Sequence, residues 1–332
     1  MRKRILRTVL MALFSAVLII SALQADRRIA QQLDTRIVST GGDLHLWERG
    51  RIVYKEKEYQ YKSNIKTYLL MGIDSMDEAS HKDGATNGGQ SDAIFLLIVD
   101  DEKKNWSLMS INRNTMTDVD IYDENGNCMG QTQAQICVQH GFGDGMEQSC
   151  ERTEKKVSQM LFNLPIDGYF SVNMGALPEI NDAMSGVTVD AMDTIDMPDI
   201  DVHIDAGENI TLLGMQAWGY LVWRDESQVD SATRRLERQR QYIQAAYDKI
   251  CSEEVDKLDL LTNVLRVIKN YTVIDMNVPQ VGYQIISYNK NLEQIYNLPG
   301  NETVGDRFVE YYMDDDAAKD LLVSLYYDEV EE

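Results

Sequence analysis

Basic residues are scarce in this sequence. It holds 32 Lys and Arg against 54 Asp and Glu, which gives a formal net charge of -22 over 332 residues. Most of such a surface would repel a phosphate backbone, so the charge balance argues against nucleic-acid binding. Any phosphate-binding site must then be a local basic pocket. The hydrophobic share of 44% is large enough for a packed core, and disorder is expected only near the ends.

Histidine is scarce too, with four residues, and several catalytic motifs are missing. No CxxC or Cys/His spacing is present, which argues against a zinc site. The sequence also lacks a P-loop, a GxGxxG motif and a recognisable nucleophile motif near a histidine. The chemistry that remains for a phosphate site is phosphoryl transfer by positioning and charge stabilisation.

The N-terminus predicts a membrane anchor. A basic tail at residues 1–7 precedes residues 8–25, which carry no formal charge and are rich in Leu, Ile, Val and Ala. A helix of this length spans about 27 Å, close to the hydrocarbon thickness of a bilayer, and the positive charges before it place the N-terminus in the cytoplasm. A cleaved signal peptide is the rival interpretation, but Leu23 is a poor match to the small residue expected before a cut after Ala25. We therefore expect a single-pass protein of the cell membrane whose main domain is extracytoplasmic.

The cysteines would lie in that extracytoplasmic space, where disulfides persist. They are Cys128, Cys137, Cys150 and Cys251. Four cysteines allow three pairings, and Cys137 with Cys150 is favoured because the two are close in the sequence. Small buried hydrophobic side chains are an equally good interpretation, so both stay open.

Strand-length apolar runs alternate with helical patterns after residue 63. The strand candidates are 66–73, 94–99, 106–111, 119–122, 167–173 and 187–189, and the helix candidates are 131–139, 149–163, 176–184, 213–224, 233–250 and 257–269. This mixture predicts an α/β fold in which helices flank a central mixed, largely antiparallel sheet. Residues 26–62 are predicted to be a stalk with a lead-in strand between membrane and domain. Residues 63–332 hold no internal repeat and are predicted to form one domain that ends in an acidic tail at 311–332.

The runs at 94–99 and 106–111 are separated by a short charged segment, which predicts a hairpin buried on both faces. Asp92 precedes the first strand and Arg113 follows the second, so antiparallel pairing brings the acid and the base to one edge of the sheet. A structural ion pair is the alternative to a functional site there. Asp74 ends the run 66–73, and a glycine-rich loop of the kind that carries binding groups separates it from Asp92.

Two carboxylates within about 4 Å repel by a few kcal/mol, so such a pair recruits a cation or a guanidinium. Mg²⁺ is held by one or two carboxylates together with water and phosphate oxygens, and the planar fork of arginine suits phosphate. Four arginines between 234 and 240 form the most localised basic patch of the chain, although an exposed face paired with surface acids is the other interpretation. These parts together predict a diphosphate site.

Six short segments also carry a family resemblance. They are YLLMGIDS at 68–75, SDAI at 91–94, SINRNT at 110–115, LPIDGY at 164–169, GVTV at 186–189 and RLERQ at 235–239. Their order resembles that of the LytR-CpsA-Psr family, and the likeness runs from about residue 63 to at least 252. The resemblance implies a cell-wall phosphotransferase that moves a glycopolymer, such as a teichoic acid or a capsule-like polymer, from a polyprenyl-diphosphate carrier to a hydroxyl of peptidoglycan. It further implies Mg²⁺ as the cofactor and a hydrophobic groove for the lipid.

The resemblance also assigns roles to individual residues. Asp74 and Asp92 correspond to the metal- and phosphate-site carboxylates, with Asp92 also a candidate base. Arg113 and Arg224 correspond to catalytic arginines. The substrate-binding residues implied are Arg235, Arg238 and Gln239, together with Gln135, whose match is looser.

Three departures from the family pattern bear on activity. Asn112 and Asn114 stand where a proline and an aspartate flank the motif arginine, Met76 replaces an arginine, and the spacing before Arg235 is two residues longer. An active enzyme remains the favoured prediction because Asp74, Asp92 and the arginines are kept. The alternative is a non-catalytic polyprenyl-diphosphate-binding or cell-envelope regulatory protein. A transcriptional role ranks below both, because the basic tail is too short to bind DNA specifically.

Overall fold

The computed structural model describes residues 50–84, 86–223, 266–277, 288–304 and 309–330, together with 234, 237, 238, 241, 242, 244–246, 248, 249, 263, 264, 280, 281 and 284. The predicted tail at 1–7, the membrane segment at 8–25 and most of the stalk lie outside these residues. Among the residues that are described, no helix is both long and apolar enough to cross a membrane.

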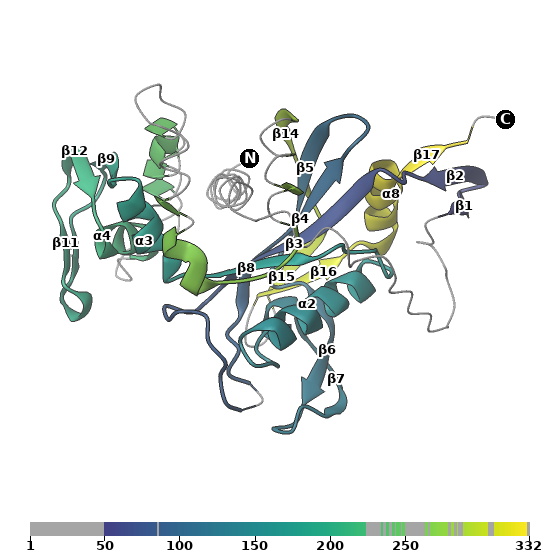
Figure 1. Cartoon of the computed structure of the whole chain (residues 1–332), viewed down its shortest axis with the longest axis horizontal. Coiled ribbons are helices and arrows are strands. Elements are labelled where there is room, and N and C mark those ends of the chain that lie inside the picture. Colours follow the sequence, from purple (N-terminus) through teal and green to yellow (C-terminus); the bar gives the residue numbers. More distant parts are fainter. Residues whose placement is uncertain are drawn as a thin grey trace.

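A six-stranded sheet forms the centre of the molecule (Figure 1). In spatial order its strands are β13 (Thr272–Asp275), β8 (Tyr169–Asn173), β3 (Ile65–Ile73), β4 (Ser91–Asp100), β5 (Asn105–Ile111) and β14 (Asn289–Asn297). The pairs β8–β3 and β5–β14 are parallel and the other three are antiparallel. The predicted mixed, largely antiparallel sheet is therefore confirmed, as is the hairpin of β4 and β5.

Both faces of this sheet are covered by other elements. Successive side chains of a strand point to opposite faces, so each strand contributes to two buried clusters. On β3, Tyr68 and Leu70 belong to one buried cluster, while Leu69 and Met71 belong to the other. The first cluster includes side chains of α3 (Ala176–Ala183) and α4 (Met215–Val222), and the second includes side chains of α2 (Glu147–Met160) and α8 (Asp315–Tyr326). Burial of each large apolar side chain contributes about 1.5–3 kcal/mol, so the sheet is anchored from both sides.

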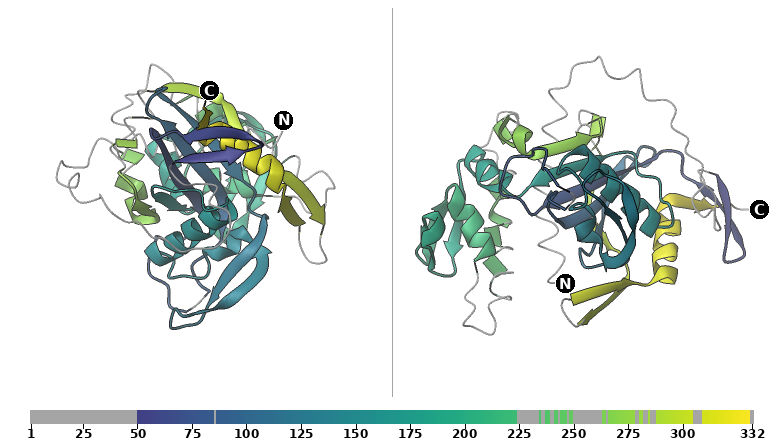
Figure 2. Two further views of the ribbon diagram at one scale, coloured as in Figure 1. Left: turned by 90° about the vertical axis from the view of Figure 1, so that its right-hand side faces the viewer. Right: turned by 90° about the horizontal axis from the view of Figure 1, so that it is seen from below.

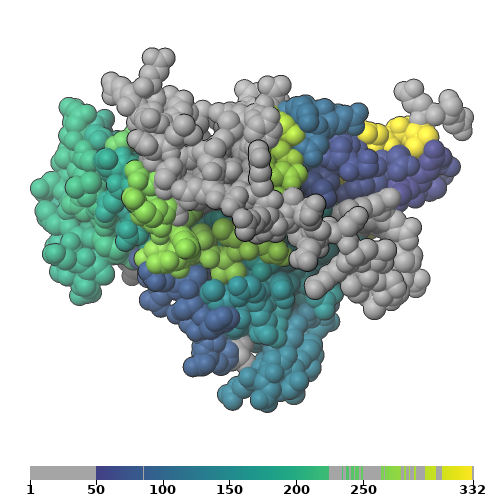
Figure 3. All heavy atoms as spheres, viewed as in Figure 1, coloured from purple at the N-terminus to yellow at the C-terminus, as the bar shows by residue number. Residues whose placement is uncertain are grey.

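Four two-stranded sheets surround the central sheet in the part of the chain that the structure describes (Figure 2). They are β6 (Met116–Tyr122) with β7 (Cys128–Gln135), β9 (Val187–Ala191) with β12 (Gly207–Leu212), β10 (Ile195–Met197) with β11 (Val202–Ile204), and β15 (Gly300–Val304) with β16 (Val309–Met313). Strands β9 to β12 form a lobe with α3 and α4 at one end of the molecule, drawn in green and teal in Figure 3. The β6–β7 hairpin and the loop 74–90 both lie on the lower side in Figure 1.

The two ends of the described chain meet in one small sheet. Strands β1 (Arg51–Tyr54) and β2 (Lys57–Tyr61) form a hairpin, and β17 (Tyr327–Glu329) pairs with β2. The lead-in strand predicted before residue 63 is thus a hairpin at residues 51–61, which belongs to the folded domain. The predicted acidic tail is wrong as a description of 311–330, since this segment forms the end of β16, α8 and β17. Four apolar side chains on one face of α8 explain the difference by packing in the core: Ala318, Leu322, Val323 and Tyr326.

The segment 131–139 also differs from its prediction. It continues β7 as far as Gln135 and then forms a 3-10 turn at Ile136–Gln139, instead of a helix throughout. Pairing with β6 explains the extended conformation, since Met116 lies opposite Gln135 at the end of that ladder. The turn then directs the chain under the edge of β4 towards α2.

Candidate active site

A β-bulge places Asp92 at the edge of the sheet. Along β3 and β4, Gly72 pairs with Ala93 and Ile73 pairs with Ser91, so Asp92 is the additional residue between two regular pairs. A bulge of this kind turns a side chain away from the ladder and is frequent beside active sites. Just beyond it, the amide of Asp74 donates to the carbonyl of Gln90 at 2.8 Å, which keeps the ends of the two strands together.

The register of the hairpin brings Arg113 opposite Asp92. The last regular pair of β4 and β5 joins Ile94 with Ile111, and each charged residue lies two positions further out. Arg113 Nη1 lies 2.8 Å from Asp92 Oδ1, and both side chains are largely covered. The structure therefore brings Asp92 and Arg113 together at the edge where the sequence predicted their meeting.

The electrostatics of Asp92 reflect three neighbouring features. Burial raises the pKa of its carboxyl, the charge of Asp74 raises it further, and Arg113 opposes both. The 2.8 Å contact is not aligned as a hydrogen bond, and neither Asp92 Oδ1 nor Arg113 Nε has a hydrogen-bond partner among the described residues. A buried polar atom left without a partner costs about 1–3 kcal/mol, so both atoms favour an additional polar ligand at this edge.

Two residues that sequence reasoning missed hold the guanidinium of Arg113. Its Nη2 donates to Gln90 Oε1 at 2.6 Å and to Cys137 Sγ at 3.3 Å. Gln90 directly precedes the Ser91-Asp92 motif, and this adjacency was the only signal for it in the sequence. Cys137 comes from the 3-10 turn after β7, and nothing in its spacing indicated that it reaches Arg113.

The structure also tests the predicted disulfide between Cys137 and Cys150. Cys137 and Cys150 are buried and are not bonded to each other, and Cys128 is a free, exposed cysteine. The favoured disulfide is therefore wrong, and for Cys137 and Cys150 the interpretation as small buried side chains is confirmed. Burial raises the pKa of the Cys137 thiol although Arg113 acts in the opposite direction. Cys251 lies outside the described residues.

Gln135 joins the same network from the end of β7. Its Nε2 donates to Asn114 Oδ1 at 3.0 Å and to the Val309 carbonyl at 2.8 Å. Asn112 Oδ1 in turn accepts from the amide of Asn114 at 3.1 Å. The two asparagines that depart from the family pattern thus fix the turn that carries Arg113.

Arg238 has a different environment from the one we predicted for a substrate ligand. Its side chain is 1% exposed, and its three nitrogens donate to Asp193 and to the carbonyls of Tyr220 and Trp223. Arg234 bonds to the same Asp193. Burial alone would raise the pKa of Asp193, but the two arginines outweigh it and hold the pKa below its usual range. In this structure Arg238 is bound to Asp193 and to the C-terminal end of α4, and its role in substrate binding stays a prediction.

The remaining predicted residues are Arg224, Arg235 and Gln239, which lie outside the described residues. The structure consequently assembles the half of the predicted site that comes from the strand edge. That half comprises Asp74, Asp92, Arg113 and Gln135.

The donor set at this edge fits a magnesium ion. Asp74 is exposed and close enough to Asp92 to raise the pKa of its carboxyl. Asp92 offers a buried oxygen that has no hydrogen-bond partner among the described residues. Hard carboxylate oxygens, with room on the exposed side for water and phosphate oxygens, are the arrangement that Mg²⁺ favours.

Comparison with known proteins assigns the chain to a family. The model of the LytR_cpsA_psr family matches residues 43–324. The chain belongs to the LytR_cpsA_psr family. The match begins before the predicted domain boundary at 63 and includes most of α8, in agreement with the folded ends of the domain.

Two curated members of the LytR_cpsA_psr family illustrate the similarity. A Bacillus cereus protein is 29% identical over 265 residues, which are 78% of this chain and 77% of the relative. An Enterococcus faecalis protein is 30% identical over 204 residues, which are 60% of this chain and 59% of the relative. Both are named polyisoprenyl-teichoic acid–peptidoglycan teichoic acid transferase TagU.

Solved structures share the fold. The protein gbs0355 of Streptococcus agalactiae matches with a TM-score of 0.55 at 20% identity, over 79% of this chain and 88% of that one. TagV of B. subtilis matches with a TM-score of 0.52 at 19% identity, over 80% of this chain and 98% of that one. The mixed sheet with its flanking helices is therefore the fold of this family.

Proposed function

We propose that this LytR_cpsA_psr protein is a transferase that moves a glycopolymer from a polyprenyl-diphosphate carrier to a hydroxyl of peptidoglycan and releases polyprenyl phosphate. Family membership supports the proposal, as do the curated relatives, whose names describe transfer of teichoic acid to peptidoglycan. The glycopolymer is a teichoic acid or a polymer of similar chemistry.

The observation that carries the proposal is the pair of buried polar atoms at the edge of the sheet. Asp92 Oδ1 and Arg113 Nε lack hydrogen-bond partners among the described residues, and Asp74 stands beside them. A diphosphate with its cation supplies both kinds of partner at once, since its oxygens accept from a guanidinium while its cation binds carboxylates. A purely structural ion pair would account for the contact of Asp92 Oδ1 with Arg113 Nη1, but it would leave Arg113 Nε without a partner among the described residues.

Each residue of this edge has a separate task in the proposed transfer. Asp74 and Asp92 would hold Mg²⁺, whose contribution is to neutralise charge on the diphosphate. Arg113 stabilises the negative charge that develops while the acceptor hydroxyl attacks the sugar-side phosphorus and polyprenyl phosphate departs. Asp92 is also the candidate base for that hydroxyl, because its raised pKa is closer to the working pH than that of an ordinary aspartate.

The proposal also includes the location of the protein, which follows from the predicted membrane anchor at residues 8–25. A single membrane segment with the domain outside the cytoplasm would keep the site near both the lipid carrier and the wall. The substrates are then a polyprenyl-diphosphate-linked glycan from the membrane and peptidoglycan from the wall, with no part for nucleic acid.

The test is transfer of a labelled lipid-linked glycopolymer to peptidoglycan by the purified full-length chain. Arg113→Ala is expected to lower the rate by about 10³-fold, because the guanidinium acts on transition-state charge. Arg51→Ala is the matched control, since Arg51 is exposed on β1 and pairs only with Glu58 among the described residues. Removal of Mg²⁺ with a chelator is expected to stop transfer by the unaltered chain. Normal turnover by Arg113→Ala would refute the assignment.

A non-catalytic binding function remains the second candidate because of Asn114. This residue holds Gln135 by a hydrogen bond in place of offering a carboxylate to the site. Binding of polyprenyl diphosphate without any metal-dependent transfer or phosphate release would support that function over the transferase.

A further inference from the structure

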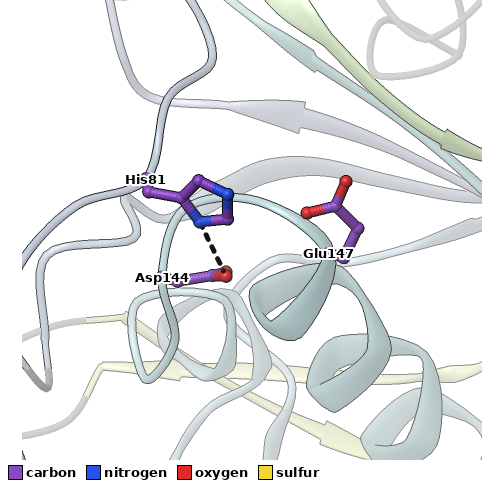
Figure 4. Close-up of side chains that lie close together, drawn as sticks. All are labelled: His81, Asp144 and Glu147. Carbon is purple, nitrogen blue, oxygen red and sulfur yellow. Dashed lines mark hydrogen bonds and ion pairs between the residues drawn. The ribbon is translucent and has the colours of Figure 1, made fainter.

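A second cluster of side chains of metal-binding type joins the loop that separates Asp74 from Asp92 to the start of α2. His81 belongs to that loop, Asp144 to the glycine-rich segment before α2, and Glu147 is the first residue of α2. One ligand atom from each of the three lies within 4.8 Å of the others (Figure 4). We propose that His81, Asp144 and Glu147 form a site for a divalent transition metal, for which zinc is the best-fitting ion.

The backbone at the start of α2 orients the Asp144 carboxylate. Its Oδ1 accepts from the amides of Met146 at 2.9 Å and Ser149 at 3.3 Å. Its Oδ2 is thereby turned towards His81, whose Nδ1 lies 3.2 Å away. Metal ligands are commonly fixed by such outer hydrogen bonds, which hold the donor atom in place before an ion arrives.

Glu147 supplies the third donor and has no competing partner. Its carboxylate makes no hydrogen bond or ion pair with any residue that the structure describes, and in Figure 4 one of its oxygens is turned towards the imidazole. Two carboxylates this close repel each other, and a bound cation removes the repulsion. The N-terminus of α2 favours the negative charge of Glu147. It does not coordinate the carboxylate, as a metal ion would.

The ligand set decides which ion fits. Imidazole nitrogen suits zinc and other transition metals, whereas Mg²⁺ prefers oxygen ligands in octahedral geometry. One nitrogen and two carboxylate oxygens match a four-coordinate zinc site that keeps one position for water. The sequence argued against zinc only through the spacing of Cys and His. His81 and Asp144 are 63 residues apart, so no local motif marks this cluster.

The site would fasten the loop that leads to Asp92. A backbone hydrogen bond of 2.7 Å already joins the amide of Lys82 to the carbonyl of Asp144, next to the proposed ion. The loop ends at Gln90, which holds Arg113. A zinc ion would therefore support the position of the neighbouring site without contributing to it directly, and the proposal does not depend on the transferase assignment.

His203 provides a matched control because it also lies between two acids. Its Nδ1 is 3.6 Å from Asp196 and its Nε2 is 3.3 Å from Asp205. The two carboxylates approach different nitrogens of the ring, so one ion cannot bind all three groups. If exposed His and Asp neighbours alone attracted zinc, both histidines would bind it.

The experiment is a calorimetric titration of the full-length chain, in detergent, with Zn²⁺ in the presence of excess Mg²⁺. One equivalent is expected to bind, His81→Ala and Glu147→Gln are each expected to weaken binding by about 10-fold or more, and His203→Ala is expected to leave it unchanged. Asp92→Asn should also bind normally, which separates this site from the predicted magnesium site. Unfolding curves recorded without zinc identify a variant that fails to fold.

Three results would overturn the proposal. The first is no zinc binding by the unaltered chain under these conditions. The second is full affinity in both His81→Ala and Glu147→Gln. The third is loss of binding in Asp92→Asn or His203→Ala while those variants remain folded, because the ion would then occupy another site.

Discussion

Arg113 is the residue around which the candidate site is built, and its position depends on Gln90. The 2.6 Å hydrogen bond from Arg113 Nη2 to Gln90 Oε1 is the shortest contact of that guanidinium with the residues that the structure describes. Gln90 is expected to act as a positioning residue, which directs the fork of Arg113 without touching the substrate. A misplacement of a catalytic group by about 1 Å can cost a large rate factor.

Gln90→Ala is therefore expected to lower kcat for transfer by about 10-fold or more while KM for the lipid donor changes little, because the guanidinium keeps its charge but loses its orientation. The measurement is steady-state transfer, accompanied by urea unfolding. Gln60→Ala is the control, because Gln60 is on the distant β2 strand. Equal kcat values for Gln90→Ala and the unaltered chain would show that Arg113 needs no such support.

The titration of Asp92 offers a test that does not depend on activity. Burial and Asp74 raise the pKa of this carboxyl, and Arg113 lowers it. Asp74→Asn is therefore expected to lower the pKa of Asp92, and Arg113→Ala is expected to raise it further. Carbon-detected NMR of labelled aspartate measures both shifts, and shifts in the same direction would contradict the arrangement.

The sign of the stability effect follows from the same shift. As the pH rises from the ordinary aspartate pKa towards the raised value, the unfolded chain loses this proton before the folded chain does. The contribution of Asp92 to the free energy of unfolding therefore decreases over that interval and stays reduced at higher pH. Such a loss of folding stability is typical of an ionisable group whose role is to bind a ligand.

The sequence predicted part of this site because antiparallel register is a local property. Asp92 and Arg113 flank two strands joined by a short turn, so their meeting follows from the hairpin alone. Cys137 reaches Arg113 only after the β6–β7 hairpin and the turn at Ile136–Gln139 have packed under the edge of β4. Contacts of that kind arise from tertiary packing and leave no periodic signal in the sequence.

At the scale of elements, α8 shows how composition can conceal a core helix. Acidic residues at its start gave the segment the character of a tail, yet Asp314 caps it by accepting from the amide of Ala317. Tyr326 is fully buried, and its hydroxyl accepts a hydrogen bond of 3.0 Å from Thr67 Oγ1 on β3. This bond links the last helix to the central sheet.

Tyr326→Phe is expected to lower the free energy of unfolding by about 1–2 kcal/mol, because the buried hydroxyl of Thr67 loses its partner. Tyr312→Phe is the matched control, since Tyr312 is 49% exposed and the hydrogen bond of its hydroxyl to Glu310 lies at the surface. Urea unfolding of the two variants provides the comparison. Equal stabilities would mean that the hydrogen bond between Thr67 and Tyr326 contributes nothing to the stability of the fold.

The elements that the sequence located correctly are those with strong apolar periodicity. Runs such as 66–73 and 94–99 became β3 and β4 because they are buried on both faces. The segment 131–139 was mistaken for a helix because its polar composition carries no alternation, and its extended form depends on pairing with β6. Local propensity is weak there, so the neighbouring strand decides the conformation.

On the scale of the whole molecule, the two ends of the domain stabilise each other. Strand β17 near the C-terminus pairs with β2, which is itself paired with β1. Ile52 and Tyr61 of this sheet are buried in the same cluster as Tyr326 and Tyr327. The sequence boundary at residue 63 therefore divides a cooperative unit, whereas the family match from residue 43 contains it.

A chain that begins at residue 63 is accordingly expected to be less stable than one that begins at residue 50. Loss of two buried side chains removes about 1.5–3 kcal/mol each, and the unpaired edge of β17 adds to the loss. With a shift of about 2–4 °C per kcal/mol for domains of similar size, the melting temperature should fall by about 10 °C. Differential scanning calorimetry of the two chains measures the difference. If both melted at the same temperature, β1 and β2 would be an appendage, and the stalk would extend to residue 62 as the sequence first suggested.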